Sequence, residues 1–104
     1  MRLHHAFLVG ATLFCFATSA FGADQTAQDL YKSKCQSCHG PDGKATAIGK
    51  KMGAKDFNDP DVVEMTEEEI VQITKDGKNK MPAYKGKLTD KQIAELAKYI
   101  KEMK

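Results

Sequence analysis

The chain has 104 residues, of which 29% are charged, 41% are hydrophobic and none is tryptophan. Its formal net charge of +2 at pH 7 gives no strong bias toward nucleic acid, and its one arginine, Arg2, stands at the extreme N-terminus. The length allows one small domain, and a domain of this size buries only about 60% of the surface that its unfolded chain exposes. We therefore expect a single domain that needs stabilisation beyond its own side chains.

Residues 1–22 are predicted to be a secretory signal peptide. Arg2 provides a positive start, an apolar stretch follows over residues 6–16, and small residues come next. Small residues two positions apart favour cleavage after Gly22 or after Ala20. The apolar stretch is too short for a membrane span. We therefore expect an exported, soluble protein without a membrane anchor, located in the periplasm.

The mature domain, residues 23–104, begins with a predicted helix from Asp24 to Cys38. Apolar residues recur there at the helical period, and the helix ends in the run Cys35-Gln36-Ser37-Cys38-His39. Positions i, i+3 and i+4 share one face of a helix, so both thiols can bond to the two vinyl groups of one porphyrin. C-x-x-C-H is the attachment signature of a c-type haem. We predict that Cys35 and Cys38 bind haem covalently and that His39 is an axial iron ligand.

Zinc binding and thiol–disulfide chemistry are the alternatives for two close cysteines. A structural zinc site takes four ligands, whereas the mature domain offers only Cys35, Cys38 and His39 as strong candidates. A thiol–disulfide motif does not need the histidine, and no alternating strand–helix pattern surrounds this one. A plain disulfide is the simplest alternative for an exported chain. The complete motif favours haem over these three.

Two segments are predicted to be loops. Residues 40–60 are interrupted by glycine and proline, with one short helical turn expected within residues 45–52. Residues 78–86 have no hydrophobic period at all.

Two capping boxes, in which a threonine N-cap is followed three residues later by Glu or Gln, each predict the start of a helix. They are Thr66-Glu67-Glu68-Glu69 and Thr89-Asp90-Lys91-Gln92. The first helix is predicted to end at Asp76-Gly77. The second has the apolar stripe Ile93, Leu96, Ala97, Ile100 and Met103. No alternating stretch is long enough for a sheet, so we predict an all-α domain.

The sixth iron position decides the chemistry, and methionine is the available ligand type because the mature domain has no second histidine. Met103 lies on a helical stripe and is better explained by core packing. Met65 precedes a helix N-cap, where apolar residues often pack against the helix, and Met52 could fill a gap in the core. Met81 precedes Pro82, which favours an extended conformation outside any packing stripe. We predict Met81 as the sixth ligand, and Met52, Met65 and an open site remain as alternatives.

Three segments together resemble the class I single-haem cytochromes c, in particular the short soluble carriers of bacteria and algae. They are Leu30-Tyr31 before Cys35–Gly40, then Gly77 with Lys80-Met81-Pro82-Ala83-Tyr84, and Leu96-Ala97-Lys98-Tyr99-Ile100. The resemblance covers nearly all of residues 24–104. It implies a small all-α cytochrome c fold, with three to four helices and long loops wrapped around one covalently bound haem c.

The resemblance also implies that the first and last helices cross tightly beside the haem. The residues expected at this crossing are Ala27 or Tyr31 on the first helix and Leu96 and Tyr99 on the last. Family members often orient the proximal imidazole through the carbonyl of a proline that follows the motif. Pro41 is too close in sequence to His39 for that role, so we expect the acceptor near Ala47 or Ile48.

The predicted function is that of a one-electron carrier, because two strong axial ligands leave no iron position for a substrate. The alternative is a haem enzyme or a gas or redox sensor with an open sixth position. Such a site would need a polar catalytic residue, and the mature domain has neither a second histidine nor an arginine to supply it.

Charges are segregated along the mature chain. Lysines gather around Met81 (Lys75, Lys78, Lys80, Lys85, Lys87 and Lys91), and acidic residues gather before them (Asp56, Asp59, Asp61, Glu64, Glu67, Glu68 and Glu69). Both runs could be ordinary solvated surface. The functional interpretation is that a monomeric protein is steered by its lysines toward redox proteins with acidic docking patches.

Overall fold

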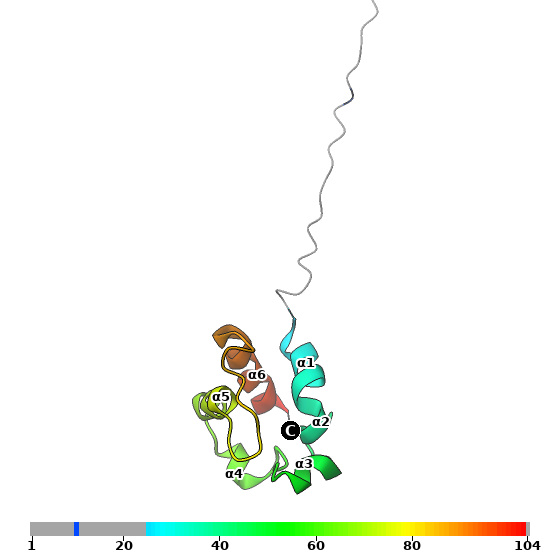
Figure 1. Cartoon of the computed structure of the whole chain (residues 1–104), viewed down its shortest axis with the longest axis vertical. Coiled ribbons are helices and arrows are strands. Elements are labelled where there is room, and N and C mark those ends of the chain that lie inside the picture. Colours follow the sequence, from blue (N-terminus) through cyan, green and yellow to red (C-terminus); the bar gives the residue numbers. More distant parts are fainter. Residues whose placement is uncertain (1–9, 11–24, 104) are drawn as a thin grey trace, which may run out of the picture.

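The computed structural model describes Gly10 and residues 25–103, so the predicted signal peptide and the first residue of the predicted helix, Asp24, lie outside the described residues apart from Gly10. The described part is helical (Figure 1). Its elements are α1 (Ala27–Leu30), η1 (Tyr31–Cys35), α2 (Gln36–His39), α3 (Ala47–Lys51), α4 (Pro60–Val63), α5 (Glu67–Asp76) and α6 (Asp90–Glu102). Two isolated bridges, Lys78–Met81 and Lys85–Leu88, are the only β-type pairings among these residues.

The first three elements form one continuous helix with a π-helical turn in its middle. It begins at Thr26, whose side chain accepts a hydrogen bond from the amide of Asp29, so the observed start is close to the predicted one. Within the π turn the amide of Gln36 donates to the carbonyl of Tyr31. The helix ends at Gly40, whose φ of 76° is a conformation that glycine adopts readily.

This N-terminal helix crosses α6, and the crossing forms the core. Leu30, Tyr31 and Leu96 are each about 1% exposed and pack together. The ring of Tyr99 lies against that of Tyr31, with 5.5 Å between centroids. The crossing of the first and last helices is therefore confirmed, with Tyr31 rather than Ala27 as the buried partner of Leu96.

Both capping boxes are present with both reciprocal hydrogen bonds, at Thr66 and Glu69 and at Thr89 and Gln92. The helix α5 ends at Asp76 before Gly77, as predicted. The short turn expected within residues 45–52 is α3.

The helix α4 was not predicted. It begins at Pro60 after the N-cap Asp59, whose side chain accepts from the amide of Asp61. With α1, η1 and α2 counted as one helix, the described residues form five helices, one more than the upper prediction. Proline at the first position after a capping aspartate is a helix-start signal that could have been used.

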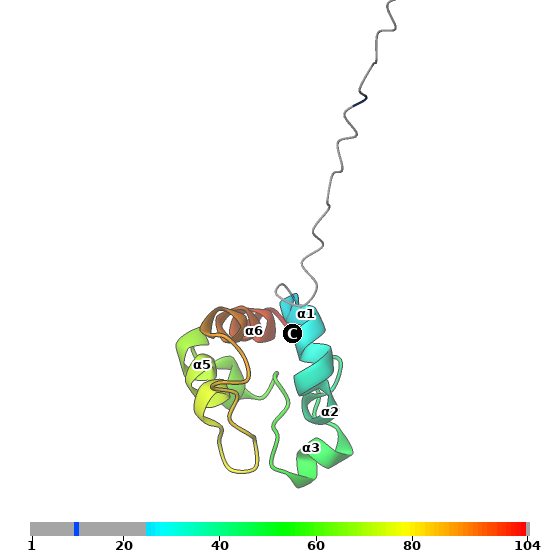
Figure 2. The ribbon, with the colours of Figure 1, turned by 45° about the horizontal axis from the view of Figure 1, so that its top comes forward.

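The helices are arranged in two groups that meet where α1 and α6 cross. Figure 2 shows α6 meeting α1 at one end, with α5 and the loop after it on one side and α2 and α3 on the other. Among the described residues, no helix has the length and apolar character required to cross a membrane.

Candidate haem site

A cavity of about 290 Å³ lies between the N-terminal helix with the end of α3 and the part formed by α5, the loop after it and α6. One wall carries Cys35, Cys38 and His39, and the opposite wall belongs to the loop after α5, with Met81 and Tyr84. Apolar side chains from the remaining elements complete the lining, among them Phe57, Val62, Ile70, Ile73, Leu96 and Ile100. The structure therefore brings all four predicted site residues to one largely apolar cavity, a setting that suits a porphyrin ring.

The two cysteines are free thiols that are half-buried in the wall. Cys35 is the last residue of η1 and Cys38 lies in α2. Burial raises the pKa of the Cys35 thiol to about 11, so this thiol stays protonated near neutral pH. Thiol–disulfide exchange requires a thiolate with a lowered pKa, and the environment of Cys35 opposes that chemistry.

The end of the N-terminal helix is held by α3. The amide of Thr46 donates to the carbonyl of Cys38 at 3.0 Å, and the Thr46 hydroxyl donates to the carbonyl of Ser37 at 2.7 Å. Gly49 approaches so closely that a Cβ there would lie 1.9 Å from the carbonyl oxygen of Cys38. These contacts fix the turn that presents Cys38 and His39, and periodicity alone did not reveal them.

His39 is oriented by an aromatic ring rather than by a carbonyl. Its ring stacks on Phe57, with 4.9 Å between centroids and 26° between planes, and burial lowers its pKa. Its Nδ1 is buried and has no hydrogen-bond partner among the described residues. The expected acceptor near Ala47 or Ile48 is therefore wrong, and the Ile48 carbonyl instead accepts from the amide of Met52 within the end of α3.

A neutral imidazole with an unsatisfied buried nitrogen is unusual for a side chain that serves only packing. Iron binds the neutral form of histidine, and the lowered pKa of His39 favours that form. These observations fit a residue placed for a group outside the polypeptide.

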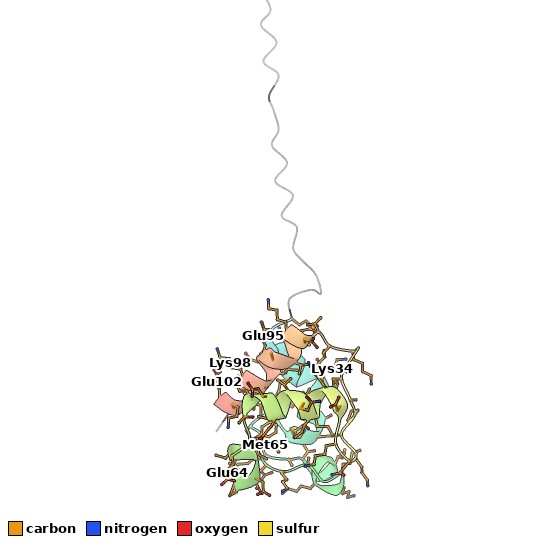
Figure 3. The ribbon with its side chains drawn as sticks, turned by 90° about the vertical axis from the view of Figure 1, so that its left-hand side faces the viewer. Lys34, Glu64, Met65, Glu95, Lys98 and Glu102 are labelled. Carbon is orange, nitrogen blue, oxygen red and sulfur yellow. The ribbon has the colours of Figure 1, made fainter. Side chains whose placement is uncertain are left out.

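Three methionines line the cavity, namely Met52, Met65 and Met81. Met52 is 41% exposed at the end of α3, and Met65 lies between α4 and α5, below α5 in the view of Figure 3. Met81 is half-buried in the loop after α5. Met103 packs against the core cluster instead, so its interpretation as a packing residue is confirmed. Lining the cavity does not by itself choose among the three.

A few hydrogen bonds and one close backbone approach hold the loop that carries Met81. Gly77 opens it with a φ of 75°, and a Cβ at Gly77 would lie 2.6 Å from the carbonyl oxygen of Met81. The amide of Tyr84 donates to the carbonyl of Thr74, and the Tyr84 hydroxyl donates to the carbonyl of Lys34 at 3.0 Å. Burial, with smaller contributions from Cys35 and Cys38, raises the pKa of Tyr84, so its hydroxyl keeps its proton.

Sequence reasoning missed the roles of Phe57, Gly49 and Tyr84. Phe57 is the one aromatic residue in the segment 40–60, and Tyr84 follows Met81 by three positions in an aperiodic loop. Such isolated aromatic residues in predicted loops are the signal that could have been used. Within the part of the chain that the structure describes, no group of three His, Cys, Asp or Glu residues could hold a metal ion, which gives no support to the zinc alternative.

A C-x-x-C-H turn in the wall of an apolar cavity, inside a small helical domain, defines the class of c-type haem proteins. Comparisons with known proteins narrow this class. The family model described as "Cytochrome C oxidase, cbb3-type, subunit III" matches residues 22–100. The chain belongs to the cytochrome c family, as a small class I cytochrome that carries electrons and has covalently bound haem c as its cofactor.

Relatives of the same size support this assignment. Cytochrome c6 of Picosynechococcus sp. is 33% identical over 101 residues, which cover 91% of this chain and 86% of the relative. Cytochrome c6 of Nostoc sp. is 36% identical over 96 residues, covering 89% and 85%. The solved structure of the KustC0563 c-type cytochrome has a TM-score of 0.72 at 29% identity and covers 77% of this chain and 99% of that one.

Proposed function

We propose that Cys35 and Cys38 form the thioether bonds to haem c, that His39 and Met81 are the axial iron ligands, and that the protein shuttles single electrons between redox partners in the periplasm. The observation that carries this proposal is the convergence of these four side chains on one apolar cavity. When bound, haem c supplies a reversible one-electron iron couple.

The protein's residues contribute by holding the same ligands in both oxidation states. Two thioether bonds and the packed helix around Cys38 keep His39 in place, and the loop brings the thioether of Met81 from the opposite wall. Methionine ligation favours the reduced iron and raises the reduction potential relative to a second histidine. An apolar lining lowers solvent access, which further tunes the potential.

A carrier role is also favoured over catalysis at the iron. An open-site haem enzyme needs a polar group above the iron, and residues 23–104 contain no arginine and no histidine besides His39. The absorption spectrum of the oxidised protein separates the two functions. A low-spin spectrum with the weak near-infrared sulfur-to-iron band is expected, whereas a high-spin spectrum without that band would indicate an open sixth position and refute the proposal.

Partner docking is proposed to use the lysines of the Met81 loop. Lys78, Lys80, Lys85 and Lys87 are exposed, and the first two also line the cavity. Acidic residues lie in α4 (Asp61), directly after it (Glu64) and in the first turn of α5 (Glu67, Glu68 and Glu69). Figure 3 shows one of them, Glu64, on the opposite side of the molecule from Lys34, which lines the cavity with the loop. The exposed lysines beside the cavity support docking of partners with acidic patches at its mouth.

Replacing Lys78, Lys80, Lys85 and Lys87 by glutamine should slow electron exchange with an acidic partner at low salt, by several-fold, and flatten its dependence on ionic strength. A matched variant removes the same charge at four exposed lysines that neither line the cavity nor belong to the group around Met81, namely Lys32, Lys44, Lys50 and Lys98. Stopped-flow rates across a salt series measure both. Equal slowing by the two variants would show that only net charge matters and would contradict docking at the loop.

Export is proposed to precede function, with cleavage after Gly22 or Ala20 and a monomeric mature domain. N-terminal sequencing of the protein purified from the periplasm tests the cleavage point. A mature protein that still begins at Met1 would contradict the proposal.

A further inference from the structure

The loop between α5 and α6 has two kinds of attachment. Most of its hydrogen bonds are local, since Lys78 and Met81 pair with each other, and the amides of Tyr84 and Lys85 donate to carbonyls of Thr74 and Lys75 at the end of α5. These bonds hold the loop to the helix from which it emerges. They do not hold it to the opposite wall of the cavity.

One hydrogen bond is different, because it joins the loop to the helix that carries the C-x-x-C-H motif. The Tyr84 hydroxyl donates to the carbonyl of Lys34, 50 positions away in sequence, at 3.0 Å. Lys34 directly precedes Cys35 in η1, and both Lys34 and Tyr84 line the cavity. Among the described residues this is the one hydrogen bond between the Met81 loop and that helix.

The tyrosine ring also covers part of the cavity edge. It is half-buried, and the ammonium of Lys87 lies 6.0 Å from its centroid. The phenyl ring of a phenylalanine would preserve this coverage. Only the hydroxyl reaches Lys34, so the ring and the hydrogen bond can be separated by one substitution.

We propose that Tyr84 is a positioning residue that latches the Met81 loop to the haem-attachment helix and so limits how often the sixth iron position opens. This inference rests on the proposed axial role of Met81. Because Tyr84 follows Met81 by only three positions, release of the hydroxyl frees the segment of the loop that carries Met81, while α5 and the helix crossing stay folded.

Cyanide binding to the oxidised protein tests the latch, because an external ligand must wait for the sixth position to open. Loss of one neutral hydrogen bond corresponds to roughly fivefold in an opening equilibrium. Tyr84→Phe should therefore bind cyanide about fivefold faster at pH 7 than wild type, while the near-infrared sulfur-to-iron band remains at rest.

Two control variants distinguish a latch from a general loss of stability. Tyr31→Phe removes a buried hydroxyl that donates to the carbonyl of Gly40 at 2.5 Å. This variant should lower the denaturation midpoint and leave the rate of cyanide binding close to the wild-type value. Tyr99→Phe removes a hydroxyl from α6, where the ring lies against Tyr31 rather than against the loop, and should leave the cyanide rate at the wild-type value.

An unchanged cyanide rate in Tyr84→Phe would overturn the latch while leaving Met81 as the ligand. Equal acceleration in Tyr31→Phe or Tyr99→Phe would overturn it as well, since opening would then follow overall stability. Absence of the near-infrared band in the wild type itself would overturn the role of Met81, and the latch with it.

Discussion

The two walls of the haem cavity are built differently. The wall with the C-x-x-C-H motif belongs to a helix that crosses α6 through Leu30, Tyr31 and Leu96, each about 1% exposed. The wall with Met81 is an aperiodic loop whose neighbouring residues Lys78, Asn79, Lys80, Pro82 and Ala83 are all exposed. One wall is stabilised by apolar burial, and the other depends on a few hydrogen bonds.

This difference shows that the two sides of a cofactor site in a small domain can differ in local stability. In the proposed site, Cys35, Cys38 and His39 lie on the part with a packed core, where local opening is costly. The proposed sixth ligand, Met81, lies on a loop with many exposed residues, where local opening costs less free energy than global unfolding. Substitutions in the first wall should therefore affect cofactor retention and global stability, and substitutions in the second should affect the iron ligand.

The largest effect is expected from the attachment residues. Replacing both Cys35 and Cys38 by serine should abolish covalent haem retention, because each thioether depends on one thiol. Haem staining after denaturing gel electrophoresis measures retention, with the two single variants for comparison. Full retention in the double variant would refute the assignment of these cysteines.

Truncation in the core should be the next largest effect. Leu96→Ala should lower the free energy of unfolding by about 2–5 kcal/mol, because it leaves a cavity at the helix crossing. Val63→Ala, at a residue that is 57% exposed, should cost less than about 1 kcal/mol. Denaturant titration of the haem-loaded proteins measures both. A cost for Leu96→Ala no larger than that for Val63→Ala would contradict the proposed core.

Two glycines of the loop allow a finer test of the second wall. Gly77 and Gly86 both have positive φ, of 75° and 82°, so alanine at either should cost about 1–2 kcal/mol of backbone strain. A Cβ at Gly77 also meets the Met81 carbonyl, whereas one at Gly86 meets nothing within 4 Å. Gly77→Ala should therefore weaken the near-infrared band as well, and Gly86→Ala should not. Near-infrared bands of equal strength in the two variants would contradict the close approach of Gly77 to the Met81 carbonyl.

The smallest expected effect is a pH dependence of the unfolding free energy that is caused by Tyr31, in the helix of the first wall. Burial, with smaller contributions from Cys35, Tyr99 and Asp42, raises the pKa of Tyr31 well above its ordinary value of 10.0. The folded state therefore holds this proton more tightly than the unfolded chain does. The corresponding stability is complete below pH 10 and is lost as the pH rises above it.

Tyr31→Phe removes this contribution, so its unfolding free energy should fall less between pH 9 and about pH 11 than that of the wild type. Denaturant titrations at the two pH values measure the difference. Parallel losses in both proteins would mean that Tyr31 is not the group responsible.

The parts of the structure that were predicted are those with local signals. The capping boxes at Thr66 and Thr89 and the glycine at 77 gave the bounds of α5 and the start of α6, since these signals act within one helical turn. The apolar stripe of α6 likewise predicted its buried face. A short motif and an interruption of periodicity before proline likewise indicated four residues that line the cavity.

The parts that were not predicted depend on contacts distant in sequence. The stacking of His39 on Phe57, the approach of Gly49 to Cys38 and the bond from Tyr84 to Lys34 join segments that no local pattern connects. The expected acceptor for His39 was wrong for the same reason. Its placement depends on how the segment after the motif folds back, and α3 directs its carbonyls into its own hydrogen bonds.

The central claim is that Met81, on the loosely fastened wall, supplies the sixth iron ligand, although Met52 and Met65 line the same cavity. The most direct measurement is the near-infrared spectrum of the oxidised protein in the three single methionine-to-alanine variants. The sulfur-to-iron band should persist in Met52→Ala and Met65→Ala and disappear in Met81→Ala. A band that survives in Met81→Ala and is lost in either of the other two would contradict the account.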